Sequence, residues 1–349
     1  MEQTLKGTII YGDEFEPIDG YITIKDGIIK NIEESTVATD VIIAPRFVNA
    51  HTHIGDSVLK DPPFLPLPEL VQPPDGLKHR ILRETSYSDL VSSIKASVQD
   101  MIKTGTYAFC DFREGGSTGI QALNDALGTH SGIKALIFGR PGDEDEGMNY
   151  LESCDGTGLS STNDLEPGYI RDIVKQTRGK NKKFAIHAGE RDQTDISSAI
   201  ELHPDFLIHL TTAGQKNIKD IADANIPVVV CPRSNYITRS GVPPISKMLD
   251  AGILVAVGTD NVMLNSVNMF SEMEFLVKTN LYDDRQVFKL CTLNGAKLLG
   301  MDKESGSIKT GKKVRLMILT KKSYNMQGIR NPLSGLVRRA RPDDIIRII

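Results

Sequence analysis

Residues 42–53 read IIAPRFVNAHTH, an apolar run that ends in His51 and His53. Side chains along a strand alternate between its two faces, so residues two apart point to the same side. Both imidazoles can therefore reach a single cation. An HxH pair alone is a weak signal, since two surface histidines give the same pattern.

Other apolar runs along the chain also end in polar side chains. The runs 183–186, 205–208 and 253–259 lead into His187, His209 and Asp260. Counting the run before His51, four predicted strands thus finish in groups that can bind a metal ion or transfer a proton. This repetition turns the weak HxH signal into a candidate metal site.

Composition limits the class of protein. With 349 residues, 40% of them hydrophobic and 25% charged, the chain is an ordinary globular one, long enough for a large domain and a smaller one. With a net charge of -4, the chain has no excess of basic residues that would indicate nucleic-acid binding. The first residues, MEQTLK, do not resemble a signal peptide, and no apolar run is long enough to span a membrane. We therefore expect a cytoplasmic protein without a membrane partner.

The cysteines carry no metal-binding or redox motif. Cys110, Cys154, Cys231 and Cys291 are scattered, with no CxxC pair. Buried or incidental thiols in a reducing compartment are the simplest interpretation.

The two ends of the chain share a β-like pattern. Between residues 7 and 43 short alternating runs flank Asp26-Gly27, a two-residue hairpin signal. A second β-like run lies at 314–319. Neither patch can bury a core alone. We therefore predict that residues 1–45 and 306–349 together form one small β-sandwich domain.

Between these ends, residues 46–305 alternate strands and helices. After the strand that leads into His51, the predicted strands are 106–112, 133–139, 156–160, 183–187, 205–209, 227–231 and 253–259. Eight βα units over about 250 residues are typical of a (β/α)8 TIM barrel in the α/β class, whose chemistry lies at the carboxyl ends of the strands. All the candidate groups fall at such ends.

A proline-rich segment, residues 59–82, follows the first barrel strand. Its six prolines restrict the unfolded chain, so we expect a formed wall over the substrate. A mobile lid, a rigid packing loop and an oligomer contact remain open alternatives. His130 is expected in a surface or loop position, and the acidic residues 143–146 in a solvated loop or at the start of a helix.

Taken together, an ordered set of motifs resembles the amidohydrolase superfamily over nearly the whole chain. The similarity is to its mononuclear-metal deaminases, such as adenosine, cytosine and S-adenosylhomocysteine deaminase. The motifs are APRFVNAHTH (44–53), HAGE (187–190), CPRSN (231–235), GTDN (258–261), TLNGA (292–296) and GSIKTGK (306–312). A departure is KVRL at 313–316, where the superfamily usually has lysine, alanine, aspartate and leucine. That difference concerns the small domain and not the site.

The resemblance implies roles for individual residues. It makes His51, His53, His187 and Asp260 the ligands of one divalent metal ion, Zn²⁺ or alternatively Fe²⁺. It makes Glu190 the proton shuttle, His209 the group that orients the nucleophile and polarises the substrate, and Asp260 a base for the attacking water.

Two other metal chemistries do not fit. The binuclear branch of the superfamily carries a carboxylated lysine at the end of strand four, where this chain has Ser160, Ser161 and Thr162. The unrelated zinc cytidine deaminases use HxE with PCxxC, and this chain has no PCxxC.

The expected activity is hydrolytic release of ammonia from an aminated N-heterocycle, such as a purine, pyrimidine, pterin or nucleoside derivative. Other C–N or C–Cl hydrolysis on a heterocycle, by ring opening or dechlorination, is the alternative, and a catalytically silent scaffold is a third. Four residues are candidates for substrate contact by topology, and each fits an ion pair or loop role equally: Arg113, Glu114, Arg233 and His79. A homo-oligomer is also possible.

Overall fold

The computed structural model describes residues 2–128, 132–142, 148–279 and 283–349. His130 and the acidic residues 143–146 lie outside the described residues. The chain divides into two compact units. The first comprises Met1–Asn49, Met101–Ala108 and Asn268–Ile349, and the second comprises Ala50–Asp100 and Phe109–Val267. These limits do not coincide with the predicted domain limits, which stay a prediction.

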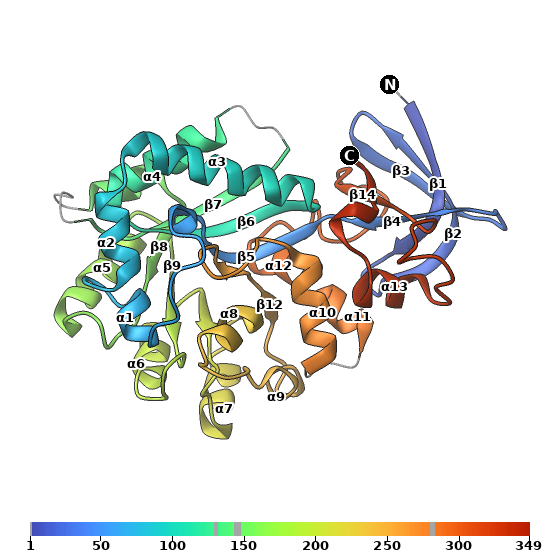
Figure 1. The fold of residues 1–349 in the computed structure, drawn as a ribbon. Coiled ribbons are helices and arrows are strands. Elements are labelled where there is room, and N and C mark those ends of the chain that lie inside the picture. The colour runs from blue at the N-terminus through green and yellow to red at the C-terminus, as the bar shows by residue number, and fades with distance from the viewer. Residues whose placement is uncertain (1, 129–131, 143–147, 280–282) are drawn as a thin grey trace. The chain divides into compact units, whose positions relative to one another are not determined.

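In the first unit, strands from both ends of the chain share one sheet (Figure 1). Its order is β15 (Ile345–Ile348), β14 (Leu316–Thr320), β4 (Val41–Pro45), β1 (Glu2–Tyr11), β2 (Glu16–Lys25) and β3 (Ile28–Glu34). The turn between β2 and β3 is the predicted hairpin, because Asp26 and Gly27 both adopt positive φ, at 54° and 74°. The two ends of the chain therefore pair as expected.

The predicted sandwich, however, needs two stacked sheets, and the described strands of this unit form a single one. Helix α13 (Pro332–Arg338) contacts β2 and buries Leu333, Leu336 and Val337. The helix also contacts α10 (Met269–Thr279) and α11 (Asp284–Leu290), and the described hydrophobic cluster of this sheet contains no residue of α13.

The second sheet contains the predicted barrel strands. Its order is β12 (Val255–Val257), β11 (Val228–Val230), β10 (Phe206–His209), β9 (Lys183–Ala188), β8 (Gly156–Leu159), β7 (Lys134–Gly139), β6 (Thr106–Arg113), β5 (Phe47–His53) and β13 (Asp260–Asn261). The pairings from β7 to β12, and that of β13 with β5, are parallel. Each strand lies within a few residues of its predicted position.

The sheet closes on itself through its last two strands. β12 and β13 occupy opposite edges, yet only Gly258 and Thr259 separate them in the chain. The Gly258 amide donates to the Val230 carbonyl of β11 at 3.0 Å, while Asp260 pairs with Thr52 of β5. β12 and β13 therefore act as one interrupted eighth strand that completes a parallel barrel.

Gly258 has no room for a side chain at this closure. A Cβ placed there would lie 2.6 Å from the backbone N and O of His51. We expect Gly258→Ala to lower the free energy of unfolding by about 1–3 kcal/mol or more, because backbone atoms cannot move aside cheaply. Denaturant unfolding measures this. Gly168→Ala is the matched control, since nothing lies within 4 Å of its Cβ position, and equal losses in the two variants would contradict the argument.

The helices follow the strands along the chain. They are α1 (Leu67–Val71), α2 (Leu77–Glu84), α3 (Tyr87–Lys103), α4 (Gly116–Leu127), α5 (Pro167–Gly179), α6 (Ile196–Glu201), α7 (Gln215–Asp223), α8 (Pro232–Ile237), α9 (Ile245–Asp250), α10 (Met269–Thr279), α11 (Asp284–Leu290) and α12 (Leu293–Leu298). Short 3₁₀ turns lie at Ile54–Val58, Asn149–Ser153 and Pro342–Asp344. Among the described residues, no helix is both long and apolar enough to cross a membrane.

The proline-rich segment is more ordered than a loop. Residues 59–82 contain α1 and most of α2. Pro68 lies in the first turn of α1, where proline fits a helix because the amide it lacks has no intrahelical acceptor there. The prolines therefore begin a helix here instead of preventing one.

Candidate metal centre and its pocket

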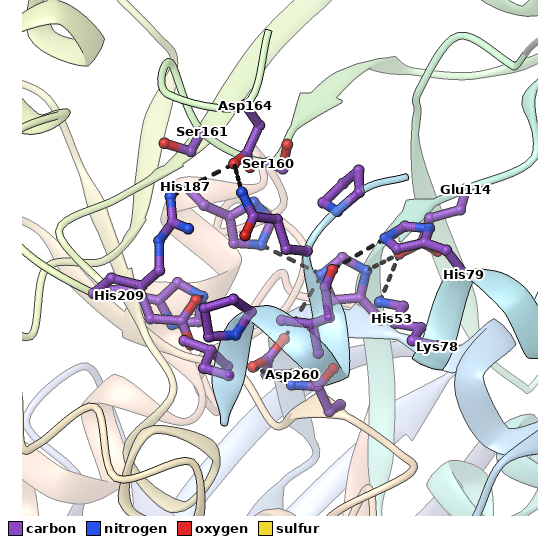
Figure 2. Close-up of a pocket in the computed structure, with 18 of the residues that line it drawn as sticks. His53, Lys78, His79, Glu114, Ser160, Ser161, Asp164, His187, His209 and Asp260 are labelled. Atoms are coloured by element: carbon purple, nitrogen blue, oxygen red, sulfur yellow. Dashed lines mark hydrogen bonds and ion pairs between the residues drawn. The ribbon is translucent and has the colours of Figure 1, made fainter. Parts of the chain in front are cut away.

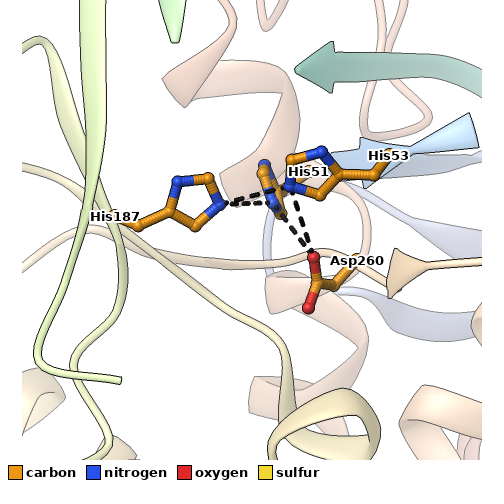
Figure 3. Close-up of side chains that lie close together, drawn as sticks. All are labelled: His51, His53, His187 and Asp260. Carbon is orange, nitrogen blue, oxygen red and sulfur yellow. Dashed lines mark hydrogen bonds and ion pairs between the residues drawn. The ribbon is translucent and has the colours of Figure 1, made fainter. Parts of the chain in front are cut away.

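Four side chains converge at the carboxyl end of the barrel strands (Figure 3). His51 and His53 come from β5, His187 from β9 and Asp260 from β13. All four are buried, and one ligand atom from each lies within 4.8 Å of the others. The structure thus brings together the four residues that the sequence proposes as metal ligands.

The spacing of the donor atoms suits a tetrahedral ion. The Nε2 atom of His187 lies 3.2 Å from that of His51 and 3.3 Å from that of His53. Asp260 Oδ1 lies 3.3 Å and 3.7 Å from the same two nitrogens. Ligands at tetrahedral Zn–N distances are about 3.3 Å apart. The donor set therefore fits one Zn²⁺-sized ion without rearrangement.

Backbone carbonyls fix two of the imidazoles. His53 Nδ1 lies 3.1 Å from the Phe112 carbonyl and 2.8 Å from Glu114 Oε1, and His187 Nδ1 lies 2.7 Å from the Leu159 carbonyl. Because carbonyls only accept, Nδ1–H donates in both rings and Nε2 keeps its lone pair. Burial lowers the pKa of His53 to about 3 and that of His187 well below its usual value. Neutral rings of this tautomer are the form that binds a metal ion.

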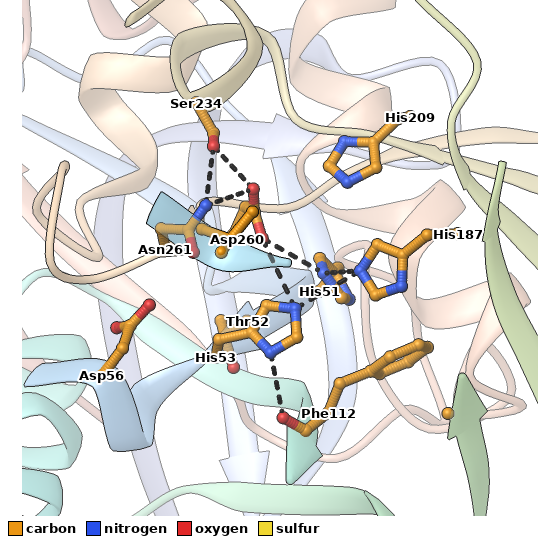
Figure 4. Close-up of polar contacts among 12 residues, drawn as sticks. His51, Thr52, His53, Asp56, Phe112, His187, His209, Ser234, Asp260 and Asn261 are labelled. Atoms are coloured by element: carbon orange, nitrogen blue, oxygen red, sulfur yellow. Dashed lines mark hydrogen bonds and ion pairs between the residues drawn. The ribbon is translucent and has the colours of Figure 1, made fainter. Parts of the chain in front are cut away.

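Asp260 is held by its other oxygen (Figure 4). Its Oδ2 accepts hydrogen bonds from Ser234 Oγ at 2.5 Å and Asn261 Nδ2 at 2.8 Å. Burial alone raises the pKa of Asp260, but the hydrogen bond with His51 and the nearby histidines outweigh it and hold the pKa well below its usual range. Oδ1 is therefore an ionised oxygen that faces the imidazoles. A second, smaller group, formed by His209, Cys231 and Asp260, shares this carboxylate.

Glu190 and His209 form a pair beside the four side chains. His209 Nε2 lies 3.5 Å from Glu190 Oε2, and Asn235 Nδ2 donates to His209 Nδ1 at 3.0 Å. Because Nδ1 accepts, the proton of a neutral His209 sits on Nε2, which faces Glu190. Burial raises the pKa of Glu190. The pair thus combines a carboxyl group that can carry a proton with a ring N–H donor.

A pocket opens over this cluster (Figure 2). The space in it that is open to water-sized molecules is about 80 Å³. Segment 59–82 lines one side with Leu67, Pro68, Val71, Gln72, Pro73, Lys78 and His79. The segment therefore borders the pocket, and its role as a fixed wall stays a prediction.

The four candidate substrate contacts divide into two pairs. Glu114 and His79 line the pocket, although each already has a protein partner: His53 for Glu114, and the Val71 carbonyl for His79 Nε2 at 3.0 Å. Arg113 and Arg233 do not line it. Arg233 Nη2 reaches Asn265 Oδ1 at 3.2 Å instead.

Arg113 is buried, which differs from the place at the substrate that topology suggested for it. It is 1% exposed, with Nη2 at 2.6 Å from Glu114 Oε2 and Nη1 at 3.4 Å from Asp111 Oδ2. Its guanidinium also fills the space where Gly55 lacks a side chain. Two buried carboxylates therefore hold Arg113 inside the protein, where it contacts Glu114 and does not line the pocket.

Arg113→Met is expected to cost about 3–5 kcal/mol of unfolding free energy, because Asp111 loses its buried counter-charge and Glu114 keeps only Lys78. Arg233→Met, which removes a partly exposed arginine, should cost about 1 kcal/mol or less. Denaturant unfolding of both variants tests this. A stable Arg113→Met protein with a raised KM would restore the original assignment as a substrate contact.

Sequence reasoning missed several residues of the site. The CPRSN and GTDN motifs contain Ser234, Asn235 and Asn261. Their hydroxyl and amide groups form hydrogen bonds, and that property marks them as candidate site residues. Arg140 directly follows the end of β7 and lines the pocket, as a polar residue at a strand end is expected to do. Lys78 is buried and lies 2.7 Å from Glu114 Oε1, and nothing in its sequence context signals this.

Comparison with known proteins agrees with this geometry. The sequence model of the amidohydrolase family matches residues 42–346. An uncharacterised protein of Methanocaldococcus jannaschii is 34% identical, over 98% of this chain and 96% of its own. The 5-methylthioadenosine/S-adenosylhomocysteine deaminase of Moorella thermoacetica is 26% identical, over 89% of this chain and 81% of its own.

The fold also matches solved structures. A zinc-bound adenosine deaminase from Xanthomonas campestris superposes with a TM-score of 0.86, over 99% of this chain and 91% of its own, at 18% identity. At this identity the match establishes the fold alone, a barrel of the expected TIM type.

Proposed function

Because this chain belongs to the amidohydrolase family, we propose that it is a metal-dependent hydrolase that releases ammonia from an aminated N-heterocycle. The observation that carries the proposal is the convergence of three imidazoles and one carboxylate beside the Glu190–His209 pair, at the base of a pocket. The deaminase named above, 26% identical over most of both chains, supports the same reaction class.

We assign His51, His53, His187 and Asp260 as the ligands of one divalent ion. Zn²⁺ suits three imidazoles and a carboxylate at tetrahedral spacing, and Fe²⁺ is the alternative. When bound, the ion supplies Lewis acidity that makes water nucleophilic near neutral pH. Ser234 and Asn261 hold Asp260 so that its Oδ1 faces the imidazoles, where it would bind the ion and could accept a proton from the attacking water.

The remaining groups move protons and orient the substrate. Glu190, whose pKa is raised by burial, can give a proton to a ring nitrogen and later assist the departing amine. His209 presents its Nε2–H beside Glu190, where it can donate to developing negative charge. Asn235 holds both side chains, since its Nδ2 also lies 3.4 Å from Glu190 Oε1.

The same groups would serve ring opening or dechlorination, so the products decide between these reactions. Metal-loaded protein should be screened for ammonia release over aminated purines, pyrimidines, pterins and nucleosides, with chelator-treated protein as the control. Ammonia should appear in equal amount to a deaminated product identified by mass. A ring-opened product, or chloride from a chlorinated analogue, without any ammonia would select the alternative. A protein that takes up no metal ion when one is supplied, and that is inactive on all of these compounds, would favour the silent scaffold.

A further inference from the structure

Two arginines lie opposite each other in the first unit. Arg46 directly follows β4, and Arg315 directly precedes β14, in the KVRL segment where the superfamily usually has an aspartate. β4 and β14 are antiparallel, with Pro45 opposite Leu316, and the Arg46 amide donates to the Arg315 carbonyl at 3.0 Å. Continuing this register by one residue places the two arginines directly opposite, where side chains point to the same face and like charges repel.

Burial makes this repulsion costly. Arg46 is 4% exposed, and Arg315 is half-buried. Both guanidiniums lie over the ring of Tyr107, with their Cζ atoms 5.7 Å and 4.6 Å from its centroid. Desolvation and the charge of Arg315 together lower the pKa of Arg46 to about 10. The fold therefore holds two cations side by side where water screens them poorly.

The chain supplies carbonyl groups to this pair but no negative charge. Arg46 Nη2 donates to the Thr106 carbonyl at 2.5 Å. Arg315 Nη1 donates to the Val314 carbonyl at 3.2 Å. Among the described residues, no carboxylate forms an ion pair with either arginine, and the charges that act on Arg46 are those of Arg315 and Tyr107. The repulsion is thus left without a counter-charge from the described part of the protein.

Several donors of the pair have no acceptor. The Nε–H groups of Arg46 and Arg315 are buried without a hydrogen-bond partner. Arg46 Nη1 and Arg315 Nη2 also lack a partner within residues 2–128, 132–142, 148–279 and 283–349, but these two atoms are not fully buried. Each side chain therefore keeps a donor that a ligand from solution can reach.

The chemistry of the pair matches a phosphate group. A guanidinium fork fits the oxygens of a phosphate or carboxylate, and arginine is the residue best suited to such contacts. A phosphate group carries about 1.5–2 negative charges near pH 7 and offers three acceptor oxygens, so it can neutralise both arginines together. A single carboxylate carries one charge and would neutralise one of them.

This position is separate from the candidate metal centre. Arg46 directly precedes the amino end of β5, whereas His51 and His53 lie at its carboxyl end. A strand rises about 3.3 Å per residue, so the five residues from Arg46 to His51 span roughly 16 Å. A ligand held by Arg46 therefore takes no part in the reaction at the metal centre.

We propose that Arg46 and Arg315 form a binding site for a phosphate-class oxyanion, either free phosphate or the phosphate group of a larger ligand. The bound oxyanion neutralises both guanidiniums and links β4, from the N-terminal part of the chain, to β14, from the C-terminal part. It stabilises the sheet of the first unit. The inference does not depend on the proposed deaminase function.

Calorimetric titration of the metal-loaded protein with inorganic phosphate and with methyl phosphate tests the proposal. The two compounds distinguish a free ion from the phosphate group of a larger molecule, and acetate at equal ionic strength controls for charge alone. The titration is repeated on chelator-treated protein and on Arg46→Gln and Arg315→Gln. Arg171→Gln, which removes an exposed arginine on α5, is the matched control.

The wild type should bind one equivalent of at least one phosphate compound, and more tightly than acetate. Arg46→Gln and Arg315→Gln should each weaken this binding about tenfold or more, the usual scale of a charge-assisted contact. Arg171→Gln should leave the affinity unchanged. Chelation should leave it unchanged as well, because the site contains no metal ligand.

Arg315→Asp gives a second test, because it places a carboxylate opposite Arg46. Without phosphate, this variant should resist denaturant at least as well as the wild type. Phosphate stabilises many proteins by exclusion from their surface, so the difference between the two proteins is the quantity to measure. Raising phosphate from Kd to ten times Kd should lower the unfolding equilibrium constant of the wild type about fivefold more than that of Arg315→Asp.

Three results would overturn the site. They are the absence of saturable phosphate binding to the wild type at millimolar concentration, an affinity unchanged in both glutamine variants, and binding that disappears on chelation, which would place the phosphate at the metal centre. The wild-type titration and its chelated control need no variant, so they remain decisive if Arg46→Gln does not fold. A clear loss of stability in phosphate-free Arg315→Asp would contradict the repulsion on which the site rests.

Discussion

Glu190→Gln should reduce kcat by about 10²–10⁴-fold while metal content and substrate affinity stay close to wild type. Glutamine keeps the shape of the side chain and can still contact Asn235, but it cannot carry a proton. Glu190 lies beside His209 and is not among the four converging ligand atoms, so the metal ion should be retained.

Steady-state ammonia release and metal analysis of the same preparation measure both quantities. Glu201→Gln is the matched control, because Glu201 is an exposed carboxylate on α6 outside the pocket. Turnover of Glu190→Gln within a few fold of wild type would assign the proton transfer to another group.

His187→Ala should remove most of the metal ion, and activity should fall with it. The wild type is expected to hold close to one divalent ion per chain. His187 Nε2 lies 3.2 Å from His51 Nε2 and 3.3 Å from His53 Nε2, so its loss opens one side of the ligand set. The vacated space also leaves the Leu159 carbonyl without its donor.

Elemental analysis after dialysis against buffer gives the metal content directly. His203→Ala is the control, since His203 is an exposed histidine outside the pocket and should leave both metal and activity unchanged. Two ions per active chain would rule out the mononuclear assignment. Full retention of metal by His187→Ala would rule out His187 as a ligand.

The sequence predicts the barrel and the place of the candidate ligands well, because both follow from one regularity. Apolar runs at βα spacing define the strands, and a polar residue at the end of such a run lies at the carboxyl edge of the sheet. His51, His53, His187 and Asp260 meet in space for this reason. The sequence does not predict whether a side chain just past a strand end points into the pocket or into the protein interior.

Arg113 and Arg140 illustrate that limit. Both sit at or just past the end of a barrel strand, yet Arg113 is drawn inward by Asp111 and Glu114 while Arg140 lines the pocket. The direction of each arginine side chain depends on nearby carboxylates and, for Arg113, on the free space beside Gly55. Both arise only when the chain has folded. In the same way, α1 and α2 form in the proline-rich segment because the prolines occupy positions where a helix tolerates them.

The barrel closes at Gly258–Thr259, next to the candidate metal ligands, so metal binding should also affect the folding of the chain. His51 belongs to the first barrel strand and Asp260 to the last, and these strands pair directly. An ion held by both residues would act as a reversible cross-link between positions 51 and 260 of the chain. The four cysteines are free, so no disulfide supplies such a link among the described residues. Joining such distant residues restricts the unfolded state, and an ion that prefers the folded form stabilises it further by mass action. Chelation should therefore loosen the barrel first at the junction of its first and last strands, and slow opening there would set the pace of metal exchange.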